Sequence, residues 1–300
     1  MSGAFDARWQ HADDECYWRT ENALVSSETR QMTREFNRDR TEFDRVPPIC
    51  MLTQPKRLPA LTDQGSVGAE IFRALAIRLK HFQERQHIKR LLVTSSIKGE
   101  GKSVISGNLA VSLARRQRTL LIDGDLHQAG LRDVIGSHGQ TGLADWWREQ
   151  QPILNYLRRM EGLPLWYLSA GQAVEQPLEI LQSPRLSETL DQLAQWFDWV
   201  IIDSPPVVPV ADSSLWARLV DRALLVVRQG KTPKSLLERA LGTENLNLLG
   251  IVTNEWQDTD HKYYRQYYKN TQHSNQVSFI EQQPSEPKNI CLPNSTRVQN

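Results

Sequence analysis

Residues 95–103 read Ser-Ser-Ile-Lys-Gly-Glu-Gly-Lys-Ser, which is typical of a loop that binds phosphate groups. Gly99 and Gly101 let backbone N–H groups approach phosphate oxygens, where a Cβ would crowd the ligand. Lys102 would neutralise phosphate charge, and the Ser103 hydroxyl would bind Mg²⁺. An apolar run precedes the loop and a helical pattern follows it, which favours a phosphate site over a chance turn, although serine replaces the usual first glycine. The predicted nucleotide contacts in the loop are Ser96, Gly99, Glu100, Gly101, Lys102 and Ser103.

Two carboxylate motifs follow at the ends of apolar runs. Asp123 and Asp125 come after the run 120–122, and Asp203 comes after the run 199–202. Side chains two residues apart at a strand end point to the same side, so Asp123 and Asp125 can both face a ligand. Ligands of a doubly wound sheet bind at the carboxyl ends of its strands, where these carboxylates and Ser103 should converge. A helix cap or a turn residue is the alternative for any one aspartate, but three behind a phosphate loop favour a site.

A mostly parallel sheet would bring these residues together. Apolar runs without polar alternation lie at 90–94, 119–122, 165–168, 199–202, 223–227 and 250–254. Such runs predict strands covered on both faces, and the helical patterns between them imply right-handed parallel crossovers. Apolar residues at helical spacing from Val67 to Phe82 predict another helix, capped by Ser66 or Asp63. The predicted fold class is therefore α/β, a doubly wound, mostly parallel sheet of the P-loop NTPase type.

The chain divides into three predicted segments. Residues 1–65 carry many charges of both signs and end in several prolines, which predicts a flexible N-terminal arm and a Pro-rich linker. Residues 66–256 are the predicted P-loop domain. Residues 257–300 are polar and rich in Asn and Gln, and they are predicted to form a flexible C-terminal tail.

Composition excludes several classes of function. The chain has 36 Lys and Arg against 35 Asp and Glu, so it lacks the basic excess of a nucleic-acid-binding protein. No stretch approaches the roughly 18–20 apolar residues that span a bilayer, and the first residues lack a signal region, which predicts a cytoplasmic protein. Cys16, Cys50 and Cys291 are widely spaced, so free thiols are expected rather than a disulfide or zinc site.

The phosphate loop, the Asp-x-Asp motif at 123–125 and the Asp-x-Pro-Pro motif at 203–206 together resemble the bacterial tyrosine kinases of capsule and exopolysaccharide biosynthesis. The resemblance covers roughly residues 66–268. It also includes the segments 165–171, 177–185, 211–212 and 250–254. The two aspartate motifs are the discriminating parts, because a phosphate loop alone occurs in many NTPases.

The resemblance implies ATP and Mg²⁺ as cofactors and assigns roles to individual residues. The predicted catalytic residues are Lys102, Asp123, Asp125 and Asp203, and the predicted metal ligands are Ser103, Asp125 and Asp203. Asp123 would accept the proton of the incoming tyrosine, because a phenol with a pKa of about 10 benefits from a nearby carboxylate base. Asn254 would read the adenine base, although a polar residue at a strand end can equally be a simple turn residue.

Four of the seven tyrosines lie within six residues, at Tyr263, Tyr264, Tyr267 and Tyr268. Their neighbours are polar, which favours phosphoacceptors over one face of a packed helix. The resemblance implies transfer in trans within an oligomer and a role in polysaccharide chain length or export. It further implies a separate membrane-embedded chain-length protein that holds this chain at the inner membrane as a peripheral protein, and a tyrosine phosphatase.

Three positions depart from the family pattern. His127 stands where the family usually has arginine and cannot form its bidentate fork, so it predicts either reduced kinase output or a tolerated loop residue. Glu70 and Arg73 match the first two positions of the family's self-association motif, but Ala76 stands at the third, so the first two could be an ordinary i,i+3 ion pair. Lys98 replaces a frequent proline.

Two other functions share part of this pattern. A positioning ATPase related to the partitioning and division-site proteins would use the same loop and Asp123, but it normally carries an extra lysine where Ile97 stands, and it gives no role to the tyrosines. A nucleotide-binding adaptor without catalysis, which gates a polysaccharide exporter, is suggested by His127 and Ala76.

Overall fold

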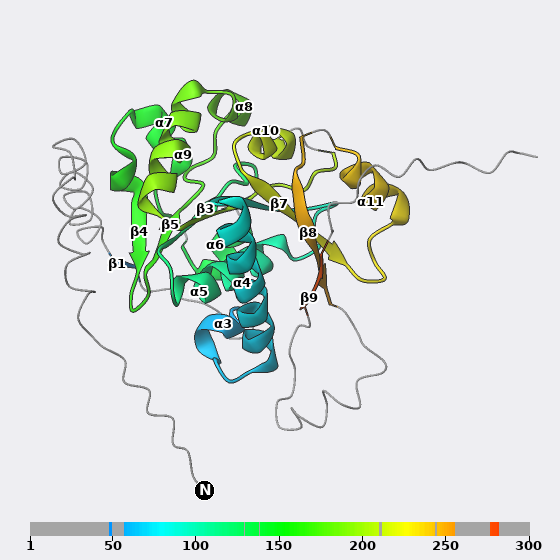
Figure 1. Ribbon diagram of the computed structural model, residues 1–300. Helices are drawn as coiled ribbons and strands as arrows, with labels where there is room; N and C mark the ends of the chain where they lie inside the picture. Colours follow the sequence, from blue (N-terminus) through cyan, green and yellow to red (C-terminus); the bar gives the residue numbers. More distant parts are fainter. Residues whose placement is uncertain are drawn as a thin grey trace, which may run out of the picture. The chain divides into compact units, whose positions relative to one another are not determined.

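The computed structural model describes residues 57–255, apart from 129, 138, 210, 211 and 244, together with the backbone of strands at 48–49 and 277–281. Within these residues nine strands form one sheet in the order β1-β4-β5-β3-β6-β2-β7-β8-β9 (Figure 1). The strands are β1 (Pro48–Ile49), β2 (Arg90–Ser95), β3 (Thr119–Asp123), β4 (Leu157–Met160), β5 (Leu165–Leu168), β6 (Trp199–Asp203), β7 (Arg222–Arg228), β8 (Leu248–Asn254) and β9 (Val277–Glu281). The helices are α3 (Pro59–Thr62), α4 (Val67–Gln86), α5 (Lys102–Ala114), α6 (Gly130–Ile135), α7 (Leu143–Glu149), α8 (Pro177–Leu181), α9 (Pro184–Trp196), α10 (Asp212–Arg218) and α11 (Lys234–Leu241), with a short 3₁₀ helix η1 (Ile153–Tyr156).

The centre of the sheet is parallel, which confirms the predicted α/β class. Strands β5, β3, β6, β2, β7 and β8 pair in parallel, whereas β4 and β9 run antiparallel to β5 and β8. These six parallel strands are the six apolar runs of the sequence. Because parallel strands end at the same edge, the loops after β2, β3 and β6 lie together, and the register pairs Asp123 directly with Asp203.

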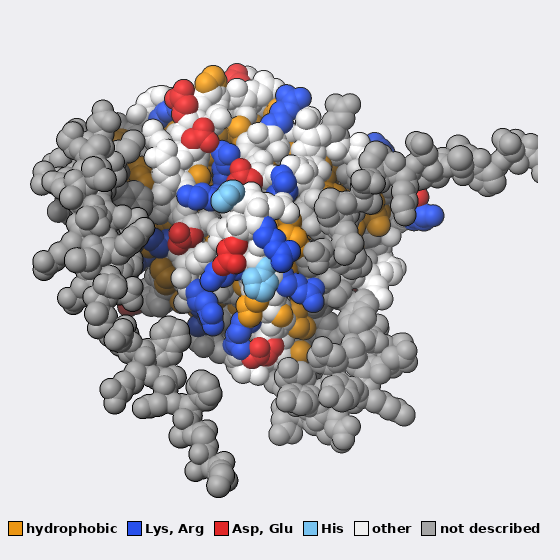
Figure 2. Space-filling view, viewed as in Figure 1, with side chains coloured by type: hydrophobic (Ala, Val, Ile, Leu, Met, Phe, Trp, Pro, Cys, Tyr) orange, Lys and Arg blue, Asp and Glu red, His pale blue; other side chains and the backbone are white. Residues whose placement is uncertain are grey.

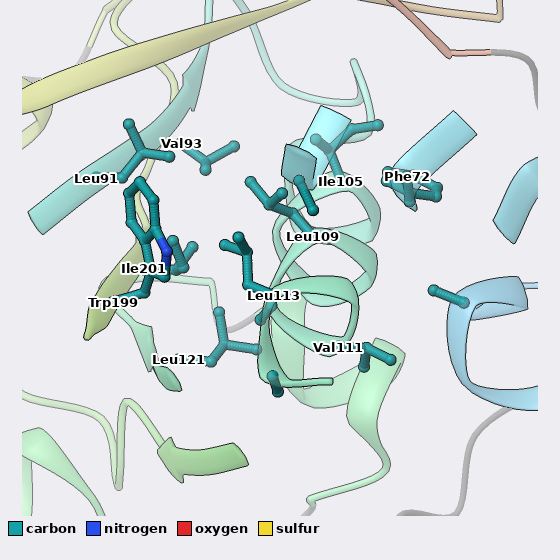
Figure 3. Close-up of a cluster of buried hydrophobic side chains, with 14 of the residues drawn as sticks. Phe72, Leu91, Val93, Ile105, Leu109, Val111, Leu113, Leu121, Trp199 and Ile201 are labelled. Atoms are coloured by element: carbon teal, nitrogen blue, oxygen red, sulfur yellow. The ribbon is translucent and has the colours of Figure 1, made fainter. Parts of the chain in front are cut away.

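Buried side chains on both faces of the sheet explain the uninterrupted apolar runs. One face packs on α4, α5 and α6, and the side chains that alternate with it point toward the helices of the other face. Figure 3 shows the first of these two cores, which contains Leu91, Val93, Leu121, Trp199 and Ile201 from the sheet, Ile105, Leu109 and Leu113 from α5, and Phe72 from α4. This core fixes α5, and with it the loop that precedes α5, against the centre of the sheet.

Helix α4 begins and ends for local reasons. The Ser66 hydroxyl accepts a hydrogen bond from the Ala69 N–H (3.2 Å), and Glu70 lies in the first turn, where the helix dipole favours a carboxylate. The helix ends at His87, whose backbone is left-handed (φ 53°). The predicted helix and its Ser66 cap are confirmed.

The packed core extends upstream of residue 66. Leu58 is completely buried, the Asn108 side-chain amide donates to the carbonyl of Arg57 (2.8 Å), and its oxygen accepts from the Ala60 N–H (3.1 Å). Short strands β1 and β9 also lie within the segments expected to be arm and tail. A sheet edge offers unpaired N–H and C=O groups, which sequence patterning alone does not reveal.

Among the described residues, none of the helices has the length and apolar character needed to cross a bilayer.

Candidate active site

The phosphate loop connects β2 to α5 and contains two glycines with a left-handed backbone, Gly99 (φ 88°) and Gly101. Gly101 has φ 93°, in the left-handed region, and a Cβ there would lie 2.1 Å from the Asn254 side-chain nitrogen. Any other residue here would strain the backbone and displace the Asn254 side chain. Directly after Gly101, α5 begins at Lys102, so its first N–H groups and its dipole point toward the loop. The local geometry is that of an anion-binding site.

Lys102 lies among carboxylates at the mouth of this loop. Its ammonium nitrogen is 3.3 Å from Asp125 Oδ2 and 3.5 Å from Ser103 Oγ, and the Lys102 and Asp125 side chains are only 11% and 7% exposed. Burial alone would lower the pKa of Lys102, but Asp203 and Asp125 outweigh it, and the pKa is raised. The lysine is therefore held as a cation, and a bound phosphate would compete with Asp125 for it.

Asp123 and Asp203 are completely buried on neighbouring strands. Asp203 Oδ1 accepts a hydrogen bond from the Ser106 hydroxyl (3.0 Å), whereas the Oδ2 atoms of both aspartates have no hydrogen-bond partner within the part of the chain that the structure describes. Burial raises the pKa of Asp123 well above its ordinary value, and the nearby Asp203 raises it further. Burial also raises the pKa of Asp203, and Lys102 offsets part of that rise. Buried oxygens without partners are expected where a ligand or an ion completes the site.

The turn after β3 is packed so closely that it requires glycine at position 124. The Gly124 N–H donates to the carbonyl of Asp203 (2.7 Å), and the Trp216 indole N–H donates to the carbonyl of Gly124 (3.0 Å). A Cβ on Gly124 would lie within 3.0 Å of atoms of Ile202, Asp203 and Trp216. This packing holds Asp123 and Asp125 on the same side, as the sequence predicts.

His127, the departure from the family arginine, contacts a buried carboxylate. Its Nε2 lies 3.0 Å from Asp212 Oδ2 at the start of α10, and the Asp212 side chain is only 3% exposed. The histidine thus faces a group that a cation would stabilise. The loop that carries Asp125 is thereby linked to α10.

Two predicted nucleotide contacts use their side chains within the protein. Glu100 is 2% exposed, and its carboxylate accepts from the Ile97 N–H (3.0 Å), across the loop. Asn254 donates from Nδ2 to the carbonyl of Glu100 (2.9 Å) and accepts on Oδ1 from the Glu255 N–H (3.0 Å). Ser96 is completely buried, and its hydroxyl has no partner among the described residues.

The predicted acceptors Tyr263, Tyr264, Tyr267 and Tyr268 lie outside the described residues.

On α4, Arg73 forms an ion pair with Glu70 and also donates to the carbonyl of Gln64 (3.1 Å), so the i,i+3 pair exists. Arg78, Lys80 and Arg85 are exposed on the same helix. Figure 2 shows Lys and Arg side chains gathered over this face of the molecule.

Sequence reasoning missed Ser106 and Thr232, and it placed Asp212 only within the resembling segment 211–212, without a role in the site. Ser106 lies one helical turn after Ser103, so helix periodicity could have placed it beside the site. Thr232 and Asp212 follow β7 and β6 at the carboxyl edge of the sheet, where ligand sites of this fold class occur. That edge rule was the available signal for both.

The donor groups fit Mg²⁺ together with a nucleotide. Ser103, Asp125 and Asp203 offer the oxygen ligands that Mg²⁺ prefers. The site holds three carboxyl groups, those of Asp123, Asp125 and Asp203, against the single ammonium group of Lys102. Among the described residues, no three His, Cys, Asp or Glu side chains form a metal cluster by themselves. Mg²⁺ usually binds one or two carboxylates and completes its shell with phosphate oxygens and water.

Comparison with known proteins finds bacterial tyrosine kinases among the relatives of this chain. The chain is 31% identical over 181 residues to the tyrosine-protein kinase CpsD of Streptococcus pneumoniae, spanning 59% of this chain and 80% of CpsD. It is 30% identical over 227 residues to the succinoglycan biosynthesis transport protein ExoP of Rhizobium meliloti, spanning 69% of this chain and 29% of ExoP. The solved BceF tyrosine kinase domain aligns with a TM-score of 0.59 at 26% identity, covering 76% of this chain and 89% of the domain. No protein-family model matches the chain.

Proposed function

This chain belongs to the bacterial tyrosine kinase family, and from that membership we propose that it transfers the γ-phosphoryl group of ATP to tyrosine hydroxyls of its own C-terminal segment. The observation that carries the proposal is the convergence of Lys102 with the buried carboxylates of Asp123, Asp125 and Asp203 at the end of the phosphate loop. Phosphoryl transfer depends on charge neutralisation and in-line positioning more than on covalent chemistry, and this arrangement supplies groups for both.

Each side chain has a role that follows from its surroundings. Lys102 would bind phosphate oxygens, and Ser103, Asp125 and Asp203 would hold Mg²⁺, which when bound would neutralise charge on those oxygens. Asp123 would accept the phenol proton as the phenol oxygen bonds to the γ-phosphorus and ADP leaves. Its raised pKa suits this role, because it brings the carboxylate closer to the pKa of the phenol than an exposed aspartate would be.

The proposed acceptors are Tyr263, Tyr264, Tyr267 and Tyr268, in what we call the acceptor segment, residues 255–276. The segment starts beside the phosphate loop, because Asn254 binds the carbonyl of Glu100, and β8 and β9 pair at Asn254 and Val277. Tyr263 lies nine residues after Asn254 and Tyr268 lies nine residues before Val277, a reach of about 30 Å. Four strand spacings, about 19 Å, separate β8 from β3, so the tyrosines could reach this chain's own Asp123 or a neighbour's.

We propose transfer in trans, between two copies of the chain. A mixing experiment tests this point: a Lys102→Met chain with intact tyrosines is incubated with a chain that carries Phe at all four acceptor positions. Label on the Lys102→Met chain would support transfer in trans. Label on neither chain, when wild type alone becomes labelled, would indicate transfer within one molecule.

The proposed setting is the control of capsule or exopolysaccharide chain length or export. The similarity to ExoP, a succinoglycan biosynthesis transport protein, supports this setting. We propose that a separate membrane-embedded chain-length protein recruits the chain to the inner membrane from the cytoplasm, and that a tyrosine phosphatase reverses the modification. A membrane protein that co-purifies with this chain only when ATP is present would support this arrangement.

Transfer of label from γ-labelled ATP to the purified chain tests the proposed reaction. Wild type should become labelled on tyrosine, and Lys102→Met should not. The quadruple Tyr→Phe variant should lose the label while it still binds ADP. Steady hydrolysis of ATP without any phosphotyrosine would instead favour a positioning ATPase, and ADP binding without either reaction would favour a nucleotide-binding adaptor.

A further inference from the structure

The phosphate loop is held from outside by a turn far away in the sequence. Residues 229–233 form the turn between β7 and α11, and the Thr232 hydroxyl contacts a carboxylate oxygen of Glu100, 132 positions earlier in the chain. We propose that Thr232 is a positioning residue for the phosphate loop: its hydroxyl holds the Glu100 carboxylate and so keeps the loop backbone in the shape that binds nucleotide phosphates. This inference rests on the nucleotide binding proposed above.

The Glu100 side chain is part of the loop's internal structure. It is 2% exposed, and Oε2 accepts a hydrogen bond from the Ile97 N–H (3.0 Å) on the opposite side of the loop. The Ser95 hydroxyl donates to the carbonyl of the same Ile97 (2.8 Å). A shift of the Glu100 carboxylate would therefore move the peptide groups of Ile97 and its neighbours.

The hydrogen bonds around Thr232 direct its single hydroxyl proton toward Glu100. The Arg228 N–H donates to Thr232 Oγ1 (2.9 Å), which fixes the oxygen. The carbonyl of Arg228 lies 3.1 Å from the same oxygen, but it already accepts the N–H groups of Lys231 (3.2 Å) and Thr232 (3.1 Å). A bond from the hydroxyl to Glu100 Oε1 is favoured over one to this carbonyl, because a buried carboxylate oxygen without a donor destabilises the fold.

The end of β8 holds the same glutamate from its backbone. Asn254 donates from Nδ2 to the carbonyl of Glu100 (2.9 Å). The β8 end and the β7–α11 turn are joined to each other, because Glu255 forms ion pairs with Arg228 and with Lys231 (3.5 Å). Glu100 is thus fixed at two points by one connected frame, which is how a binding loop is pre-organised for its ligand.

Removing only the hydroxyl tests the proposal. Thr232→Val keeps the shape of the side chain and removes the donor, and Thr232→Ser keeps the donor. The dissociation constant of ADP, measured by calorimetry, should rise about tenfold or more in Thr232→Val, as expected for a lost hydrogen bond to a buried charge. It should stay close to wild type in Thr232→Ser. The effect should fall on the KM for ATP rather than on kcat, because Thr232 does not touch the reacting groups.

Thr243→Val is the matched control. The Thr243 hydroxyl donates to the carbonyl of Arg239 in α11 (3.3 Å), one helical turn earlier. The same chemical change there should leave ADP affinity unaltered. Thermal unfolding of each variant reports whether the fold persists. If Thr232→Val is not folded, the ADP affinity of Thr232→Ala tests the proposal in its place.

A double-mutant cycle separates action through Glu100 from a general loss of packing. In a Glu100→Ala background, Thr232→Val should cause no further loss of ADP affinity. The inference is overturned if Thr232→Val binds ADP as tightly as wild type, or if its full effect persists without the glutamate. A wild-type chain that fails to bind ADP would overturn the proposed function itself, and this inference with it.

Discussion

Replacing Asp123 by asparagine should remove phosphotransfer and at the same time stabilise the fold. Asp123 and Asp203 are completely buried, are paired in register on adjacent strands, and each has one oxygen without a partner among the described residues. Two like charges about 5 Å apart repel by about 3 kcal/mol at an effective dielectric constant of about 20. Lys102 offsets part of this repulsion. We expect Asp123→Asn to raise the free energy of unfolding by about 1–2 kcal/mol, or Tm by about 3–6 °C.

The gain should depend on pH in a defined direction. Burial, together with Asp203, raises the pKa of Asp123 in the folded state, so the folded chain binds this proton more tightly than the unfolded chain. Wild-type stability is therefore favoured below the unfolded pKa of about 4 and declines as pH rises toward the folded pKa. The advantage of Asp123→Asn should be absent near pH 4 and grow at higher pH.

Urea unfolding in EDTA without nucleotide measures this effect, and Asp145→Asn is the matched control. Asp145 is equally buried, but its carboxylate accepts from the N–H groups of Gly142 (2.9 Å) and Gln172 (3.2 Å) and from Arg148 (3.1 Å). The same substitution there should cost about 2 kcal/mol. If Asp123→Asn is also destabilising, or if it still transfers phosphate at the wild-type rate, the assignment of Asp123 as a strained catalytic carboxylate is refuted.

Two further predictions concern ion pairs outside the phosphate loop. His127→Ala should destabilise the fold by at most about 1 kcal/mol, because the half-exposed imidazole lies 3.0 Å from Asp212 Oδ2, an atom that has no hydrogen-bond partner among the described residues, whereas His127→Arg should be at least as stable as wild type; thermal unfolding of both variants decides this. Burial would raise the pKa of Asp221, but hydrogen bonds from the Arg90 and Lys89 N–H groups and the Arg90 side chain lower it overall. Asp221→Asn should therefore cost about 1 kcal/mol at pH 7, and the difference from wild type should shrink as pH falls below about 4; an unchanged difference at pH 2–3 would contradict the assignment.

The parallel strands could be predicted because burial on both faces leaves a plain record in the sequence. The run Leu120–Ile122 is one example: each side chain meets a packed helix layer, so no polar residue interrupts it. Strand β4 left no such record, because it is short and its central residues are Arg158 and Arg159. The Arg159 guanidinium lies over the Trp166 ring, 5.9 Å from its centroid, an arrangement that only the folded chain reveals.

The candidate site also contains features that could be predicted from the sequence and features that could not. The common location of Lys102, Ser103 and the motif aspartates could be predicted, because each lies within a short strand-and-loop unit and parallel strands end at the same edge of the sheet. The inward use of Glu100 could not, because its partner Thr232 is 132 positions away and is brought there by the packing of β7 beside β2. The bond of the Asn254 amide to the loop backbone was likewise not predicted, and its contact with the adenine base stays a prediction.

Phosphopeptide mapping of the acceptor segment, on protein taken from its native cells, tests the central claim most directly. The proposed function predicts phosphate on one or more of Tyr263, Tyr264, Tyr267 and Tyr268 in the wild-type chain. It predicts none of that phosphate when Lys102→Met replaces every copy in the cell. An acceptor segment without phosphotyrosine in wild type, or equal modification in the Lys102→Met strain, would contradict it.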